Sequence, residues 1–213
     1  MRNKTVHSCP SCGTLNTSQL RESVMLICRA CGNIVYDKVL GAVRPKPSTI
    51  PPDWSFVQLN TTGEYKQQPF TIVGRVRLQL RNDYKNFWSA ALNDGRSIWL
   101  MDSFASFAVL REDWHTYTNS ISDVRAGKTF HARKGLKLRG DFVEKCEGIS
   151  FEGEIGSWKL FEPGFFFVQA ANSGNEIAVF TIVNKKDVDF LSGEKIEVEQ
   201  LALNNIIAWD EWK

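Results

Sequence analysis

The alternation of apolar and polar residues predicts that the chain is built almost entirely from β-strands from residue 54 onward. The run from Phe70 to Leu80 is rich in β-branched residues, and in its second half apolar positions 76, 78 and 80 alternate with polar ones, mostly arginines. A period of two is typical of a strand with one face in the core and the other in solvent. Similar patterns predict strands at Phe87–Leu92, Ser97–Met101, Phe104–Leu110, Thr129–Ala132, Gly135–Leu138, Phe142–Cys146, Ile149–Ile155, Phe165–Ala170, Glu176–Val183 and Lys195–Leu201.

Short turns join most of these predicted strands. Asp94 and Gly95 lie between two of them, and an Asp-Gly pair supplies the positive φ that a tight hairpin requires. Residues 111–126 are polar and read as a connection, in which Asp113–Val124 has room for a short helix. Many short, aromatic-rich strands favour an antiparallel β-sandwich or barrel-like domain. The expected fold class is therefore mainly β.

Four cysteines near the N-terminus form two matched pairs, Cys9 with Cys12 and Cys28 with Cys31. The C-x2-C-x15-C-x2-C spacing is typical of a zinc site, because each pair makes a turn that aims two thiolates at one ion. A glycine follows each pair and suits a tight turn at positive φ. Two disulfides or free thiols are the alternative, but neither accounts for the duplicated pattern. Four sulfur ligands close the coordination shell, so we expect one structural Zn²⁺ per chain.

The same patterns divide the chain into three parts. Residues 1–41 form the predicted zinc ribbon, with short strands at Ser23–Cys28 and Asn33–Tyr36, and so few apolar residues that folding should depend on the metal. Residues 42–53 form a Pro-rich linker that we expect to be extended and semi-rigid. Residues 54–213 form the predicted all-β domain.

Composition and cysteine use indicate the compartment. Hydrophobic residues make up 43% of the 213 residues, which is ample for a core. Thiolate ligands and one unpaired cysteine, Cys146, are typical of a reducing compartment, and Cys146 itself is expected to be a small buried residue. We find neither a signal peptide nor an apolar run near the roughly 18 residues that span a bilayer. These features predict a cytoplasmic protein.

Charge is distributed unevenly along the chain. Residues 1–145 carry 21 Lys and Arg against 12 Asp and Glu, whereas residues 146–213 carry 5 against 12, so net charges of +9 and −7 give +2 in total. No acid interrupts the most basic segment, which contains Arg125, Lys128, Arg133, Lys134, Lys137 and Arg139. With arginines 75, 77 and 81 this segment could bind nucleic acid or anionic lipid. The alternative is a solvated sheet face that balances the acidic C-terminal third.

Few residues suggest catalysis. No nucleophile elbow, phosphate-binding loop or H-E-x-x-H motif is present. Glu152 and Glu154 alternate with apolar or small residues and could form a carboxylate pair for acid/base work, although a solvated strand face is the alternative. At the C-terminus, Trp209 and Trp212 either cap the β domain or offer an aromatic anchor for a partner.

Several of these segments resemble an uncharacterised bacterial family named only as domain of unknown function 4178. The resemblance covers about residues 54–203 and is carried by Val57–Tyr65, Pro69–Arg75, Asp94–Leu100 and a segment starting at Gly153. Family members often carry an N-terminal ribbon with C-P-x-C-G knuckles. The resemblance implies an all-β fold and a bacterial setting linked to stress or membranes, without an established reaction. The chain departs from the family at Trp88–Ala91, where an acidic residue is usual.

Together these features predict a non-enzymatic intracellular adaptor with a structural zinc ribbon and a protein-binding β domain. One alternative is a nucleic-acid-binding protein that uses the ribbon and the basic segment 125–139. A weaker alternative is an enzyme that uses the Glu152 and Glu154 pair.

Overall fold

The computed structural model describes residues 5–37, 50–51, 53–103, 106–112, 124–133, 135–159, 161–183 and 188–208. The fold of these residues is mainly β and antiparallel, which confirms the fold class predicted from the sequence. Most of the predicted Pro-rich linker and of the polar connection after residue 112 lies outside the described residues. The predicted domain boundaries therefore stay predictions.

The described part of the chain contains fourteen strands and one short 3-10 helix, joined by turns and loops. The four-cysteine ribbon contains β1 (Thr5–Ser8), β2 (Leu15–Ser18), β3 (Met25–Ile27) and β4 (Ile34–Asp37). The β domain contains β5 (Thr62–Tyr65), β6 (Gln68–Leu80), β7 (Tyr84–Leu92), β8 (Ser97–Ser103), β9 (Ser106–Glu112), β10 (Thr129–Arg133), β11 (Leu136–Ile155), β12 (Phe166–Ala171), β13 (Glu176–Ile182), β14 (Val188–Ile196) and the 3-10 helix η2 (Val198–Leu201).

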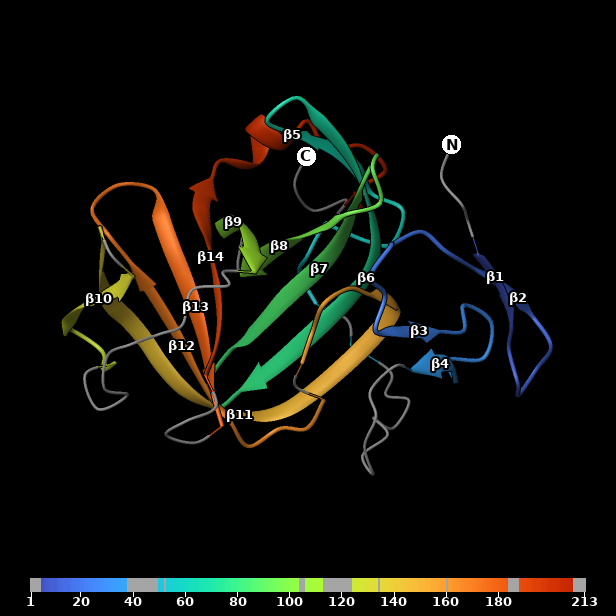
Figure 1. The fold of residues 1–213 in the computed structure, drawn as a ribbon, viewed down its shortest axis with the longest axis horizontal. Coiled ribbons are helices and arrows are strands. Elements are labelled where there is room, and N and C mark those ends of the chain that lie inside the picture. The colour runs from blue at the N-terminus through green and yellow to red at the C-terminus, as the bar shows by residue number, and fades with distance from the viewer. Residues whose placement is uncertain are drawn as a thin grey trace.

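Eight of these strands close into an antiparallel barrel (Figure 1). Hydrogen bonds connect them in the order β6-β7-β8-β9-β14-β13-β12-β11, and β11 then pairs with β6 to close the ring. β5 and β10 extend the ring as hairpins with β6 and β11. Of the two architectures that the sequence allows, the structure therefore adopts the barrel.

Strand β11 organises the β domain because it changes partners along its 20 residues. Its first part pairs with β10 and β12, residues 146–153 pair with β6, and Glu154 and Ile155 pair with β3 of the ribbon. The sequence predicts three separate strands here. The structure corrects this, because Gly140 and Gly148 lie at register shifts where a bulge bends the strand instead of ending it.

Large side chains fill the barrel. Phe87, Trp99 and Phe167 are fully buried there, and the main core cluster draws on seven strands of the ring, with Leu191 of β14 packed against it. A second cluster covers the outer face of β6 to β9, where Trp88 packs with residues such as Leu201 of η2. β7 and β8 are consequently buried on both faces.

The C-terminal end of the predicted strand Lys195–Leu201 is helical instead. β14 ends at Ile196, and η2 follows after Glu197, whose backbone amide donates to the side chain of Gln200 at 3.2 Å. This turn lets Leu201 fold back and become fully buried against the outer face of the barrel. A continued strand would have carried Leu201 away from that face.

The ribbon packs against the end of the barrel. β3 adds to the sheet beside the last residues of β11, and the Val24 amide donates to the Ile155 carbonyl at 2.9 Å. Met25 and Ile27 belong to the same core cluster as Ile155 and Trp158 of the β domain. The β1–β2 hairpin forms its own two-stranded sheet at the far side of the ribbon (Figure 1). The ribbon is therefore part of the barrel's packing.

Candidate metal centre and its attachment to the barrel

Two knuckles bring the four cysteines together. In the first, the Cys9 amide donates to the Thr14 carbonyl and the Gly13 amide donates to the Cys9 carbonyl, both at 2.9 Å. The second repeats this geometry around Cys28 and Gly32. Gly13 and Gly32 have φ values of 74° and 70°, in the left-handed region that glycine adopts at little cost. The glycine after each pair thus has the conformational role expected from the sequence.

The four sulfur atoms form a compact cluster. All four Sγ atoms lie within 4.8 Å of one another, with Cys9 and Cys31 at 3.7 Å and Cys12 and Cys28 at 3.6 Å. Zn–S bonds of about 2.3 Å give a tetrahedron with an edge of about 3.8 Å. None of the five cysteines of the chain forms a disulfide. The residues therefore fit one tetrahedral metal ion, and the disulfide alternative is excluded.

Hydrogen bonds separate the pKa values of these thiols. The backbone amide of Cys31 lowers the pKa of Cys28 to about 6, with help from the amide of Ala30. The backbone of Asn33 lowers the pKa of Cys31, but desolvation and the neighbouring sulfurs raise it overall to about 11. Four thiolates at this spacing repel one another, and a divalent cation removes that repulsion.

Asn16, which the sequence analysis missed, connects the two knuckles. Its side-chain amide group donates to the Thr14 carbonyl at 2.8 Å and lies 3.6 Å from the Cys28 Sγ, and its oxygen accepts from the Arg29 amide at 3.0 Å. Asn16 is only 4% exposed. In the sequence, Asn16 is a single polar residue four positions after Cys12. It belongs to no repeated motif like that of the cysteines, so the sequence alone does not single it out.

Glu154 attaches the ribbon to the barrel. Its carboxylate accepts from the Ser18 hydroxyl at 2.6 Å, from the Gln19 amide at 2.7 Å and from the Leu20 amide at 3.1 Å. Glu154 is 2% exposed, so these three donors replace water around the carboxylate. A residue considered for catalysis thus has a structural partner in the ribbon.

Glu152 lies two positions earlier and has a different partner. Its carboxylate is 2.7 Å from the Nε of Arg75. Gly153 between the two acids has a φ of 68°, which interrupts the alternation of the strand. Glu152 lines a groove beside the second knuckle, whereas Glu154 lines a different groove beside Gln19. The two acids therefore line different grooves and have different partners, which does not favour the carboxylate pair considered from the sequence.

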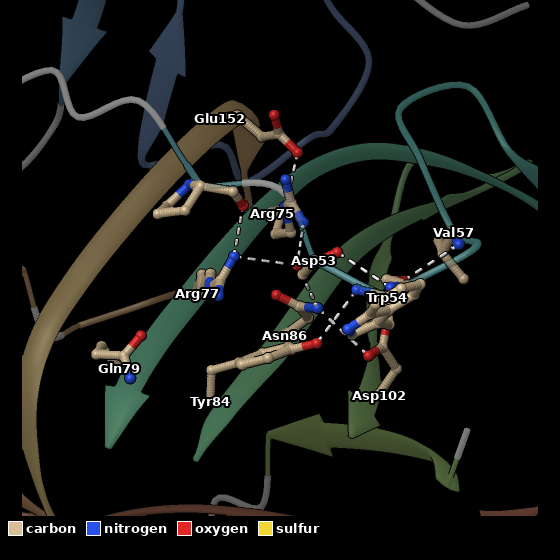
Figure 2. Close-up of polar contacts among 12 residues, drawn as sticks. Asp53, Trp54, Val57, Arg75, Arg77, Gln79, Tyr84, Asn86, Asp102 and Glu152 are labelled. Atoms are coloured by element: carbon tan, nitrogen blue, oxygen red, sulfur yellow. Dashed lines mark hydrogen bonds and ion pairs between the residues drawn. The ribbon is translucent and has the colours of Figure 1, made fainter. Parts of the chain in front are cut away.

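A buried polar network surrounds Asp53, where the chain enters the β domain (Figure 2). The Oδ2 of Asp53 accepts from Arg75 at 2.9 Å, from Arg77 at 3.2 Å and from Asn86 at 3.1 Å. Arg77 also donates to the Pro51 carbonyl at 2.6 Å. These bonds fasten Pro51 and Asp53 across β6 and β7.

The network continues to Asp102 on β8, whose carboxylate lies beneath Trp54 in Figure 2. Asp102 accepts from the Ser55 hydroxyl and the Trp88 indole, both at 2.6 Å, and from Asn86 at 3.3 Å. Burial raises the pKa of Asp102, although these hydrogen bonds act in the opposite direction. The network also holds the outer-face cluster in place, because Ser55 leads directly into Val57, which is fully buried in that cluster.

This network corrects the expectation of a solvated arginine face on β6. The side chains of Arg75 and Arg77 are only 11% and 7% exposed, because Pro51 and residues 53–57 cover that face. Each guanidinium stacks on an aromatic ring, Arg75 on Trp88 at 4.5 Å and Arg77 on Tyr84 at 4.1 Å. These two arginines therefore do not extend the basic segment 125–139.

The basic segment begins before β10, with Arg125 and Lys128, and continues into the β10–β11 hairpin. Four of its cations are exposed: Arg125, Lys128, Lys137 and Arg139. Lys137 and Arg139 alternate with buried leucines of β11, and they pair in register with His131 and Thr129 of β10. Lys134 and the side chain of Arg133 lie outside the described residues.

Three expectations from the sequence remain, and they concern Cys146, the C-terminal tryptophans and membrane-spanning segments. Cys146 is fully buried, and burial raises the pKa of its thiol to about 12, so it has the character of the small buried residue expected from the sequence. Trp209 and Trp212 lie outside the described residues, so their role as cap or anchor stays a prediction. In the part of the chain that the structure describes, no helix has the length and hydropathy of a membrane span.

Comparisons with protein-family models, with curated proteins and with solved structures found no match to this chain. The resemblance described above therefore stays a prediction, and the function must be argued from the residues.

Proposed function

We propose that this chain is a non-enzymatic intracellular adaptor, in which four cysteines hold one structural Zn²⁺ and the β domain binds a protein partner. The resemblance to domain of unknown function 4178 adds a bacterial setting linked to stress or membranes to this proposal. The observation that supports it best is a contrast between the candidate catalytic acids and the large apolar side chains on the surface. Both candidate catalytic carboxylates are engaged in structural contacts, whereas several large apolar side chains on strands are exposed.

The donor set supports zinc as the metal. Four thiolates in a tetrahedron suit zinc or iron, and they fill every position of a four-coordinate ion. Elemental analysis of freshly purified, reduced protein should give about one zinc per chain. Protein purified under these conditions with one iron per chain, or with no metal, would refute this assignment.

Exposed apolar residues at one end of the barrel support a protein partner. Phe166 on β12 is 50% exposed, and Val183, which follows β13, is 52% exposed. Phe166 pairs in register with Ile182, so the two exposed side chains belong to the same end of adjacent strands. Exposed large apolar side chains near one end of a sheet are typical of a contact surface.

The ribbon offers a second exposed pair. Val6 and Leu15 are 57% and 60% exposed, and the register of the β1–β2 hairpin places them on the same face. His7 lies on the opposite face, against the ring of Tyr36 at 4.6 Å. A comparison of the two pairs can therefore show which part of the chain recruits a partner.

The test uses the full chain and two double variants. Phe166→Ser with Val183→Ser removes the barrel pair, and Val6→Ser with Leu15→Ser removes the ribbon pair as a matched control. Affinity purification from native cells, with nuclease treatment and quantitative mass spectrometry, should recover one protein near stoichiometry that only the barrel variant loses. Loss with the ribbon variant alone would move the interface to the ribbon. Recovery of no protein, or a reaction that requires Glu152 or Glu154, would refute the proposal.

A second candidate function is nucleic-acid binding, and the exposure of Arg125, Lys128, Lys137 and Arg139 favours it. Their charge should give an affinity that falls steeply with salt. Lys137→Glu with Arg139→Glu should weaken binding of a labelled oligonucleotide, whereas Arg96→Glu, an exposed cation on the β7–β8 hairpin, should not. A salt-insensitive interaction, or none, would remove this candidate.

A further inference from the structure

The last four residues of β11 belong to two structures at once. Glu152 and Gly153 still pair with β6 and close the barrel, while Glu154 and Ile155 pair with β3 of the ribbon. The two pairings meet where Gly74 faces Gly153, and a Cβ on Gly74 would lie 2.2 Å from the carbonyl oxygen of Glu154. Closure of the barrel and docking of the ribbon therefore occur at the same place.

The metal ligands are close to this junction along the chain. Cys28 directly follows β3, and Asn16, which contacts the Cys28 Sγ, lies two residues before Ser18. Ser18, Gln19 and Leu20 supply all three donors to the buried Glu154 carboxylate. The geometry of the sulfur cluster thus sets the positions of both ribbon segments that hold β11.

An apolar surface lies beneath these segments. Met25 is fully buried against the barrel core, together with Ile155 and Trp158, and Trp158 stacks edge-on against Trp99 at 5.3 Å. Displacement of β3 would expose these side chains at the end of the barrel. The rest of the ring does not use β3 for its hydrogen bonds.

Two grooves border the seam where the ribbon contacts the barrel. A groove of about 230 Å³ is lined by Gln19, Arg29, Leu59 and Glu154 among others. A second groove of about 400 Å³ shares Arg29 and Leu59 with it and reaches Cys28 and Cys31. Among the described residues, two residue pairs join β3 to β11, and segments held by few contacts separate at a lower free energy than the packed core unfolds.

We propose that the metal-loaded ribbon is a latch: loss of the metal releases β3 and residues 18–20 from Glu154 and Ile155 and exposes the apolar end of the barrel. The latch rests on the zinc site proposed above and goes beyond it, because it makes the metal state control access to a surface of the β domain. A metal ion that stabilised only the ribbon itself would leave that surface covered whether or not metal is bound.

Hydrogen exchange followed by mass spectrometry tests this inference on the full chain. Removal of metal with a chelator under reducing conditions should speed exchange about tenfold or more in peptides covering residues 17–27 and 152–158. Peptides from β8 and β13 in the ring should exchange as before. Glu154→Gln should speed exchange at the same seam while the protein keeps one metal per chain, because the charged acceptor of three donors is lost. Glu147→Gln, an exposed acid on the same strand, is the matched control.

The outcomes separate the two proposals. Absence of zinc from the purified protein refutes the proposed zinc site, whereas a zinc-loaded protein whose seam does not respond to chelation refutes the latch alone. Faster exchange throughout the ring after chelation also refutes the latch, because the metal would then support the whole fold. Wild-type exchange in Glu154→Gln would show that this carboxylate does not hold the ribbon.

Discussion

Replacement of Asp53 by alanine should destabilise the fold by about 3 kcal/mol, since it removes the counter-charge of two buried arginines. The carboxylate of Asp53 is 6% exposed, and it accepts from Arg75, Arg77 and Asn86. Removing one partner from a buried ion pair costs about 3–5 kcal/mol. Arg75 keeps Glu152 at 2.7 Å, and both arginines keep their aromatic rings, so we expect the lower end of that range.

The source of this loss can be isolated with a second substitution. Arg77 has no other carboxylate partner among the described residues, so it should account for most of the penalty. Arg77→Met in the Asp53→Ala background should therefore recover at least about 1 kcal/mol relative to the sum of the two single changes. Urea unfolding at pH 7, followed by circular dichroism, measures each free energy, and an unchanged m-value keeps the comparison valid.

Two results would refute this reasoning. A loss below about 1 kcal/mol for Asp53→Ala would mean that water reaches the arginines and replaces the carboxylate. Strict additivity of the two substitutions would mean that Asp53 and Arg77 do not interact energetically. Asp94→Ala, which removes an exposed hairpin ion pair with Arg96, is the matched control and should cost about 1 kcal/mol or less.

Three further predictions concern the network, the junction and the buried cysteine. Because burial holds the pKa of Asp102 above its ordinary value, the native state favours the protonated carboxyl more than the unfolded state does. The stability that this raised pKa contributes to the fold is then complete below the unfolded pKa of about 3.9, and it is lost as pH rises through the higher folded pKa. Wild type should lose stability relative to Asp102→Asn between acidic and neutral pH in urea titrations, and a constant or opposite difference would contradict this. Gly74→Ala should cost more than about 2 kcal/mol, because its Cβ meets the backbone of β11 at 2.2 Å, and a thermal melt like that of wild type would show that the strands can separate. Cys146→Ala should leave elemental zinc content unchanged, because this thiol lies in the barrel core, and a fall in zinc would show that it takes part in the metal site.

The sequence was most informative where short stretches of chain decide the structure. The spacing of Cys9, Cys12, Cys28 and Cys31 predicts the sulfur cluster, because a two-residue gap and a glycine determine each knuckle locally. Alternation predicts most strands of the barrel for the same reason, since the direction of each side chain follows from the strand itself. At the ends of strands this reasoning failed, as η2 shows after Ile196.

The tertiary structure decided which faces are covered and which acids are used. Alternation places Arg75 and Arg77 opposite the core, but only the passage of Pro51 and residues 53–57 across the sheet buries them beside Asp53. In the sequence, Glu154 is one acid among the alternating residues of a strand. In the structure its carboxylate accepts from the Ser18 hydroxyl, 136 positions earlier in the chain. Such contacts depend on how distant segments meet, and local periodicity contains no information about them.

The sequence by itself therefore determined a four-cysteine cluster, a mainly β fold and the approximate positions of the strands. Only the tertiary structure decided that β11 closes a barrel and that the ribbon packs against the end of that barrel. It also decided that Glu152 and Glu154 bind two different structural partners, Arg75 and the ribbon. The physical reason is the range of the interactions. Knuckle geometry and strand alternation are determined within a few residues, whereas closure, docking and burial arise from contacts between residues far apart in the chain.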